Sequence, residues 1–225
     1  MKRLVFAVFA LLATLGIASA LSANEAKDWR TDISINTQGT ILVGNPAAPV
    51  KLAEYLSYTC PHCAHFTNES ETDLVGTLVR DGKVQIEMHA ATRDALDFAA
   101  AMLVRCVPHN ALLSTHVALM ESQEGLLYQA EMLPALKIRP DQLTLKDVRS
   151  MAENTDLSVF AKAAGMDDAA INRCYSDAAL LNQVKAQTKK AWSIIKGTPS
   201  FAINDKPVTS LDWQELQPKL QQAGA

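Results

Sequence analysis

The stretch YTCPHCAHF, residues 58–66, places two cysteines three positions apart, with a proline and a histidine between them. Before it, residues 50–58 mix alternating and bulky apolar side chains, which predicts a buried strand. After it, apolar residues recur at helical spacing until Asp81 and Gly82, which end a helix. The order strand, Cys-x-x-Cys, helix therefore places Cys60 at the N-terminal end of a helix.

That position favours a negatively charged sulfur, because unpaired amide groups and the positive end of the helix dipole face it. A thiolate is both the better attacking group and the better leaving group. Cys63 lies one turn further along, Pro61 suits the first helical position, and His62 adds a donor or a positive charge near the Cys60 sulfur. We therefore expect a redox-active disulfide between Cys60 and Cys63.

Two other functions of this stretch stay open at the level of the sequence. Cys60, Cys63 and His65 form part of a zinc or copper(I) ligand set, although a closed zinc site takes four ligands and no second Cys-x-x-Cys completes it. A purely structural disulfide is also possible, but closing so short a loop stabilises a fold little. The redox hypothesis needs no metal and no organic cofactor, because the disulfide itself holds two electrons.

Further along the chain, residues 83–90 predict a second strand, parallel to the first, with a right-handed helical crossover between them. Residues 39–44 predict a short preceding strand, and residues 24–38 a polar lead-in with one helical turn. No convincing strand occurs between residues 94 and 193. Helices are predicted there at 94–107, 111–122, 125–136, 144–153, 157–164, 167–175 and 178–196.

After Gly197 the pattern returns to strand, turn, strand and helix, at residues 199–204, 207–210 and 211–222. The strands on both sides of the helical block must share one sheet, since neither set can bury a core alone. The predicted fold class is α/β with an inserted all-helical domain. The predicted parts are residues 21–93 and 194–225 for the sheet domain and 94–193 for the insertion.

The first twenty residues have the features of a secretory signal peptide: a basic start, an apolar core and a small-x-small cleavage site at residues 18–20. An uncleaved membrane anchor is the alternative. Cleavage removes Lys2 and Arg3 and takes the formal charge from −3 to −5, and an acidic chain without a basic run argues against nucleic acid as a partner. Export to the periplasm would also let disulfides persist.

A second segment supports redox chemistry. In the stretch GTPSF, residues 197–201, Pro199 begins a predicted strand, and cis peptide bonds are almost confined to X–Pro. A cis bond there would leave the backbone groups of Thr198 free to pair with an extended substrate beside the disulfide. Such pairing reads main chain rather than side chains, so many unfolded substrates can bind.

With these residues in place, the chain resembles the DsbA family of thiol–disulfide oxidoreductases, over nearly its whole length after residue 20. The resemblance rests on VGNPAAPVKLAEYLSYTCPHC (43–63), the helical block and IKGTPSFAIN (195–204). It implies a thioredoxin-like fold and an oxidising active pair, the direction known for the DsbA oxidase. It also implies that Cys60 is the exposed attacking cysteine, that Cys63 is buried and that Pro199 is cis.

The resemblance further implies a buried acidic residue beneath the pair, which relays a proton to or from Cys63. Glu54, six residues before Cys60, matches that position. The alternative for Glu54 is an exposed charge on the strand. We expect His89, His109 and His116 to be structural or surface residues.

Two features depart from the pattern of the enterobacterial oxidase. Thr198 precedes the proline where that oxidase has valine, and threonine at this place also occurs in disulfide isomerases. Cys106 and Cys174 form an extra pair in the helical block, and a bridge between them would close a loop of about 70 residues and contribute roughly 4 kcal/mol. The alternatives for this pair are two reduced, buried cysteines or a pair that tunes the potential of Cys60 and Cys63.

The sequence thus predicts a periplasmic thiol–disulfide oxidoreductase that donates disulfides to exported proteins with reduced cysteines. The resemblance implies that a DsbB-like membrane oxidase recharges it. The alternatives are a disulfide isomerase or reductase, and a copper-binding or holdase protein. A monomer is predicted, because isomerases of this type add a long N-terminal dimerisation domain and only a short segment precedes the first predicted strand.

Overall fold

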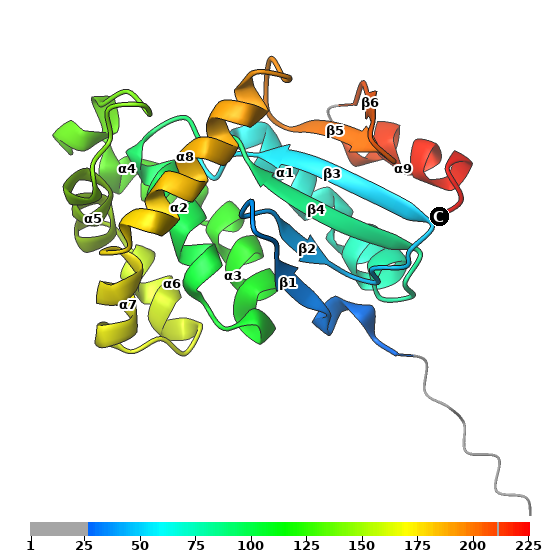
Figure 1. Ribbon diagram of the computed structural model, residues 1–225, viewed down its shortest axis with the longest axis horizontal. Helices are drawn as coiled ribbons and strands as arrows, with labels where there is room; N and C mark the ends of the chain where they lie inside the picture. Colours follow the sequence, from blue (N-terminus) through cyan, green and yellow to red (C-terminus); the bar gives the residue numbers. More distant parts are fainter. Residues whose placement is uncertain (1–26, 211) are drawn as a thin grey trace, which may run out of the picture.

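A computed structural model describes residues 27–210 and 212–225, so the predicted signal peptide at residues 1–20 lies outside the described residues. Its centre is a six-stranded sheet with strand order β1-β2-β4-β3-β5-β6, seen across the middle of Figure 1. The strands are β1 (Ile33–Ile35), β2 (Ile41–Val43), β3 (Val50–Leu56), β4 (Val84–Ala90), β5 (Ser200–Ile203) and β6 (Lys206–Val208).

The central pair of this sheet is parallel. β3 and β4 run side by side from Val50 opposite Val84 to Leu56 opposite Ala90, while every other pair of neighbours in the sheet is antiparallel. Parallel neighbours need a crossover connection, here the helical segment that begins at the cysteine motif. The predicted strand–helix–strand unit is confirmed, and the segment after residue 197 joins the same sheet beside β3.

The crossover has two parts with different geometry. It starts as α1 (Pro61–Ser70) and continues without a break as a π-helix, η2 (Glu71–Val79). The buried residue Phe66 of α1 packs against Phe201 of β5, with ring centroids 4.6 Å apart, and against Trp213 at 6.5 Å. Trp213 begins the last helix, α9 (Trp213–Gln222), so α1 and α9 cover the same face of the sheet, behind it in Figure 1.

The long helix α8 (Ala178–Trp192) lies on the other face, in front of the sheet in Figure 1, where it contacts β4 and also α2 (Ala95–Cys106). Every residue of α2 from Ala95 to Val104 is buried, so α2 is the central helix of the inserted part. The other elements there are α3 (His109–Glu121), α4 (Gln123–Ala130), the 3₁₀ turn η3 (Pro134–Lys137), α5 (Leu145–Asn154), α6 (Leu157–Ala163) and α7 (Asp168–Cys174).

The structure corrects two of the predicted elements. The segment predicted as a polar lead-in, residues 24–38, also contains a strand: a 3₁₀ turn, η1 (Trp29–Thr31), is followed by the edge strand β1, which pairs with β2. A strand of three residues is too short for its sequence pattern to predict that pairing. The helix predicted at residues 125–136 ends at Ala130, and Pro134 starts a separate 3₁₀ turn. The residue before a proline avoids helical geometry, and Leu133 is extended.

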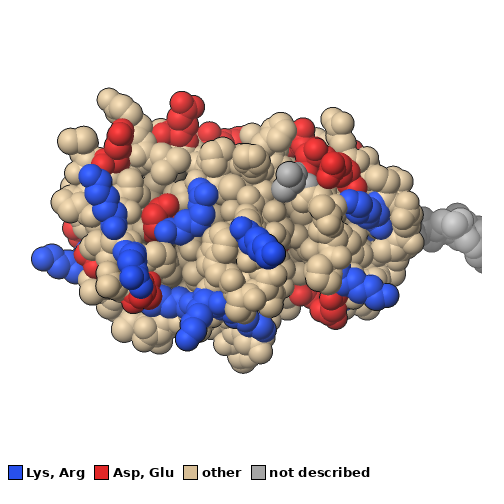
Figure 2. Space-filling model, turned by 90° about the horizontal axis from the view of Figure 1, so that it is seen from above, with Lys and Arg blue, Asp and Glu red and all other residues tan. Residues whose placement is uncertain are grey.

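In the part of the chain that the structure describes, no helix is long and apolar enough to cross a membrane. Figure 2 shows the molecule from above, with Lys and Arg side chains and Asp and Glu side chains in small separate groups, and uncharged surface between them. This mixed surface agrees with the small net charge of −3.

Candidate active site

The two cysteines lie where β3 ends and α1 begins, as the sequence predicts. Cys60 is the N-cap residue of α1, with extended backbone angles (φ −99°, ψ 115°), and Pro61 is the first helical residue. The amide groups of Cys63 and Ala64 donate hydrogen bonds to the Cys60 carbonyl, at 3.0 and 3.2 Å. Both thiols are in the reduced form.

Residues 138 positions apart in the sequence meet at the Cys60 sulfur. The Cys60 Sγ lies 3.0 Å from the Thr198 carbonyl oxygen, which accepts a hydrogen bond from the thiol. The Thr198–Pro199 peptide bond is cis, as predicted, and Pro199 is buried. The folded chain therefore brings the two predicted segments, the cysteine motif and the Thr-Pro segment, into direct contact.

The expected contrast in exposure between the two cysteines is wrong. Cys60 is only 4% exposed and Cys63 is 0% exposed, because the Thr198 segment lies against the Cys60 sulfur. The exposed residues of the motif are Pro61 and His62. What distinguishes the two sulfurs is their surroundings rather than their access to solvent.

Those surroundings shift the two thiols in opposite directions. The pKa of Cys60 is lowered to about 4, mainly by a hydrogen bond from the Cys63 side chain and further by the Thr198 side chain and the backbone amides of Cys63 and His62, against the effect of burial. The Thr198 carbonyl oxygen can accept a hydrogen bond only from the protonated sulfur, so it favours the thiol, whereas the Thr198 side chain favours the thiolate. The pKa of Cys63 is raised far above its ordinary value by burial. At neutral pH the pair is thus one thiolate and one thiol.

Glu54 is buried, and the alternative of an exposed charge on the strand is wrong. It lies in the middle of β3, opposite Met88 of β4 and Phe201 of β5, and is 4% exposed. Its Oε1 atom has no hydrogen-bond partner in the described part of the chain. Burial raises the pKa of Glu54 to about 8, and its charge would raise the pKa of Cys63.

A buried aspartate that is not among the predicted site residues holds the segment before Cys60. Asp97, near the start of α2, is 0% exposed and accepts hydrogen bonds from the Ser57 hydroxyl (2.5 Å), the Tyr58 amide (2.7 Å) and the Arg93 amide (3.0 Å). Burial, followed by the charge of Asp94, raises its pKa to about 7. Asp94 caps α2 through the Asp97 amide, so the Asp-x-x-Asp start of this helix was a usable signal.

A second missed residue reaches the same segment from α4. The Gln123 side chain is buried and its Nε2 donates to the carbonyls of Tyr58 (2.9 Å) and Cys60 (3.1 Å). The Arg93 guanidinium donates to the Thr59 carbonyl between them. Nothing in the sequence near Gln123 indicates these contacts, because they join residues more than 60 positions apart.

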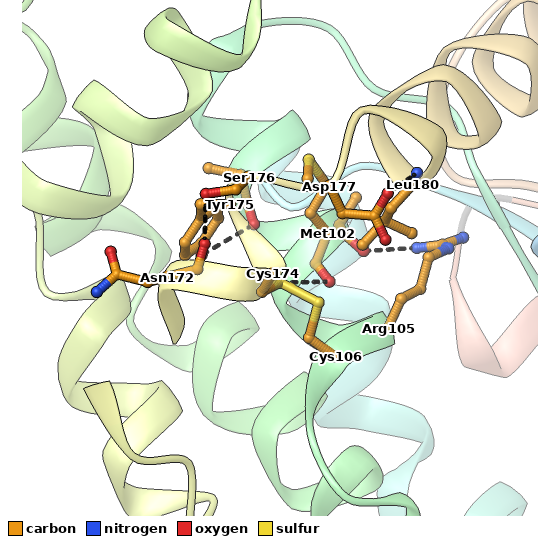
Figure 3. The surroundings of a disulfide bond; sticks show 11 residues. Met102, Arg105, Cys106, Asn172, Cys174, Tyr175, Ser176, Asp177 and Leu180 are labelled. Carbon is orange, nitrogen blue, oxygen red and sulfur yellow. Dashed lines mark hydrogen bonds between the residues drawn. A yellow bond between two sulfur atoms is a disulfide. The ribbon is translucent and has the colours of Figure 1, made fainter. Parts of the chain in front are cut away.

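The structure contains the predicted disulfide between Cys106 and Cys174, which are 68 positions apart and have a Cα–Cα distance of 5.9 Å. Figure 3 shows the bridge between the last residue of α2 and the last residue of α7. Cys174 also lies against the Met102 carbonyl, at 3.6 Å. The bridge thus fastens the C-terminal ends of two helices of the inserted part.

The histidines have different surroundings. His65 is exposed and lies 3.1 Å from Glu69 on the next turn of α1, His89 stacks on Tyr55 with ring centroids 4.8 Å apart, and His109 is exposed. His116 is buried and bonded to Tyr58. Over residues 27–210 and 212–225, no three His, Cys, Asp or Glu side chains gather as a group that could hold a metal ion.

Comparison with known families and curated proteins places this geometry among disulfide-handling proteins. A family model described as thioredoxin matches residues 36–222. Two curated relatives have names that propose a protein-disulfide oxidoreductase activity: one from Rickettsia prowazekii, 31% identical over 91 residues, and one from Rickettsia felis, 26% identical over 105 residues. These matches cover 39% and 46% of this chain, but only 33% and 37% of the relatives.

Solved structures match over most of their length. A protein-disulfide isomerase from Novosphingobium aromaticivorans is 34% identical with a TM-score of 0.72, and the match covers 82% of this chain and 97% of that one. Wolbachia pipientis alpha-DsbA1 (18% identical, TM-score 0.63, 86% and 95% covered) and Bacillus subtilis BdbD (17%, 0.60, 89% and 98%) have the same fold.

Proposed function

The chain belongs to the thioredoxin family and has the fold of its DsbA-like members, and from this premise we propose that it is a thiol–disulfide oxidoreductase that donates the Cys60–Cys63 disulfide to exported proteins. The observation that supports this direction most is the contrast between the two thiols, one with a pKa near 4 and one strongly raised. A stabilised thiolate favours the reduced pair, so the disulfide oxidises other thiols.

The proposed reaction has two exchange steps. A substrate thiolate attacks the Cys60 sulfur, the Cys60–Cys63 bond breaks, and the leaving Cys63 thiolate takes up a proton, for which Glu54 is the neighbouring acid. A second substrate thiolate then attacks the substrate sulfur of the mixed disulfide, and Cys60 leaves as a thiolate. The substrate loses two electrons and the Cys60–Cys63 pair gains them, so no other cofactor is needed.

We place this protein in the periplasm, on the strength of the signal peptide predicted at residues 1–20, and propose that it acts as a monomer. Its substrates are then newly exported proteins with reduced cysteines. A DsbB-like membrane oxidase would accept the electrons from Cys60 and Cys63 and restore the disulfide. The Cys106–Cys174 bridge already closes a loop elsewhere, and the proposed cycle does not route electrons through it.

A second candidate function is disulfide isomerisation. It is favoured by the likeness to the Novosphingobium protein-disulfide isomerase and by Thr198 before the cis proline. An isomerase works with its pair reduced, because the Cys60 thiolate must attack a wrong disulfide in the substrate and then be displaced. Both candidates use the same atoms and differ in the reduction potential and in the state in which the pair is kept.

Redox equilibrium with glutathione tests the proposal. We expect the Cys60–Cys63 pair to be largely reduced in a buffer where thioredoxin is oxidised, and the oxidised protein to convert reduced ribonuclease to its disulfide form. The matched variants are Cys60→Ser, which abolishes the reaction, and Cys106→Ser/Cys174→Ser, which leaves the exchange chemistry in place. A potential close to that of thioredoxin would refute donation and favour a reductase.

A further assay separates the proposal from a metal-binding role. If the motif held a metal, copper(I) and zinc titrations would show tight binding to the reduced protein and loss of that binding in Cys60→Ala. For the proposed oxidase we expect no metal binding that is lost in Cys60→Ala. A protein that binds metal tightly but neither oxidises ribonuclease nor reduces insulin contradicts the proposal.

A further inference from the structure

A small cavity lies next to Glu54. Its volume is about 20 Å³, which is room for one water molecule. Glu54, the buried hydroxyls of Thr67 and Ser70, and His116 all line it. Glu54, whose Oε1 atom has no hydrogen-bond partner in the described chain, is part of this cavity wall, so the cavity is polar on several sides. An internal water normally makes two to four hydrogen bonds to such groups.

The orientation of His116 follows from its contact with Tyr58. The Tyr58 hydroxyl lies 3.0 Å from His116 Nδ1, and Tyr58 is 5% exposed. A buried hydroxyl needs an acceptor for its proton, so we assign Tyr58 as the donor and Nδ1 as the acceptor. Burial lowers the pKa of His116 to about 4, so the ring is neutral at pH 7. The proton of a neutral ring then resides on Nε2, and His116 is one of the residues that line the cavity.

The cavity leads toward the surface. Four of its lining residues, Glu71, Val75, Leu113 and Val117, also line a groove of about 500 Å³ on the surface. The first two belong to η2 and the other two to α3, so the groove runs between these helices. Glu71 is half-buried and is the ionisable residue common to the cavity and the groove.

If Glu54 supplies the proton that Cys63 takes up in the proposed function, it needs a route by which protons can exchange with the surface. Each reduction of the disulfide leaves a proton on Cys63 and a charge on Glu54, in the centre of the sheet. The ionisable groups around Glu54 are Cys63 on α1, Glu71 on η2, His116 on α3 and Tyr58 in the loop. Its strand neighbours Met88 and Phe201 have no ionisable groups.

We propose that the cavity holds one water molecule between Glu54 and His116, and that protons pass through it between Glu54 and Glu71 at the surface groove. His116 is a positioning residue: its Nε2–H, directed by the Tyr58 hydroxyl, donates to the water and so stabilises the Glu54 carboxylate. The inference rests on the proposed function only for the use of the protons. The water site itself depends on the geometry of the described residues alone.

The water can be sought without any substitution. Transfer of NMR magnetisation from a long-lived water to the methyl groups of Met88 and Val117, both in the cavity wall, is the expected result for the reduced protein. Failure to observe this transfer, with the methyl signals assigned and sharp, would overturn the proposal. The measurement needs no enzyme activity, so it is independent of the proposed function.

The role of His116 is tested by titrating the side-chain carboxyl of Glu54 by carbon NMR. In His116→Phe we expect the midpoint to rise by about one pH unit, since the carboxylate loses a donor through the water. His116→Gln, which retains an amide donor, restores much of the shift and covers the case that the Phe variant does not fold. His109→Phe, an exposed histidine of the same helix, is the control, and equal midpoints in all variants would overturn the proposal.

The route through Glu71 is tested by kinetics. In stopped-flow reduction of the oxidised protein by dithiothreitol, Glu71→Gln should slow the step by roughly tenfold with a larger solvent isotope effect, as expected when an acid–base group is lost. In a Glu54→Gln background the same substitution should have no further effect. An undiminished rate in Glu71→Gln would overturn the route, whereas a wild-type protein without any exchange activity would refute the proposed function instead.

Discussion

The raised pKa of Glu54 predicts how the stability of the folded protein depends on pH. The folded protein holds the Glu54 proton up to about pH 8, whereas an unfolded chain releases it near the ordinary value of 4.5. Between these values the folded state binds more protons than the unfolded state, so stability must fall as the pH rises. Glu54→Gln removes this titration and should become progressively more stable than the wild type over the same range.

The magnitude follows from the two pKa values, because Glu54 is fully buried. Each pH unit between them costs the wild type about 1.4 kcal/mol, and allowing for incomplete titration at both ends the difference between pH 5 and pH 8 is about 3.5 kcal/mol. Above pH 8 the difference levels off. The buried glutamine amide adds a constant offset, so the slope with pH is the quantity that tests the argument.

Urea unfolding followed by tryptophan fluorescence at several pH values measures it. A Cys60→Ser/Cys63→Ser background removes the titrating thiols from both proteins. Glu87→Gln is the matched control, because Glu87 lies on β4 opposite Ala53 and its pKa is lowered by His89 rather than raised by burial. The difference in the free energy of unfolding between Glu87→Gln and the protein that retains Glu87 should vary by no more than about 0.5 kcal/mol over this pH range. A Glu54→Gln difference that stays constant within about 1 kcal/mol from pH 5 to pH 8 would refute the assignment of a protonated Glu54.

Three further predictions concern the neighbouring residues. The ultraviolet absorbance of the Cys60 thiolate in the reduced protein should titrate with a midpoint near pH 4. The stability that the thiolate contributes should be lost progressively as the pH falls from about 9, the ordinary value for the thiol, to about 4. A midpoint near that of free cysteine would contradict the oxidase hypothesis. Gln123→Ala should lower the free energy of unfolding by about 1–3 kcal/mol, because two buried carbonyls lose their shared donor. The control, Gln129→Ala, loses only exposed contacts and should change the free energy of unfolding by less than about 1 kcal/mol. Cys106→Ser/Cys174→Ser should lower it by about 4 kcal/mol, as expected for a bridge between residues 68 positions apart, and an unchanged denaturation midpoint would show that the bridge contributes little.

The parts of the site that could be predicted from the sequence are those whose signal is local. The strand before Cys60, the helix after it and the proline at position 199 are each indicated by residues that are consecutive in the sequence. A strand period, a helix N-terminus and an X–Pro bond are properties of neighbouring residues, so a single sequence is enough to indicate them. The cis state of that proline and the position of Glu54 beneath the pair were indicated mainly by the resemblance to a known family.

The parts that could not be predicted depend on contacts between distant segments. His116 reaches Tyr58 across 58 positions, and Gln123 reaches Cys60 across 63. Histidine and glutamine on a helix are ordinary surface residues by composition, and only the packing of α3 and α4 makes these two buried. The predicted exposure of Cys60 was wrong for the same reason, since the residue that covers its sulfur, Thr198, is 138 positions away.

These distant contacts give the helical insertion a part in the chemistry. Asp97 of α2, Gln123 of α4 and His116 of α3 each bond to the segment from Ser57 to Cys60. That segment sets where the Cys60 sulfur lies relative to the start of α1, and a shift of a fraction of an ångström weakens the amide contacts that favour the thiolate. Three helices that meet the same four residues restrict such shifts more than the sheet alone can. The insertion therefore acts on the acidity of Cys60 by fixing the position of the loop, without any of its side chains touching the sulfur in a described hydrogen bond.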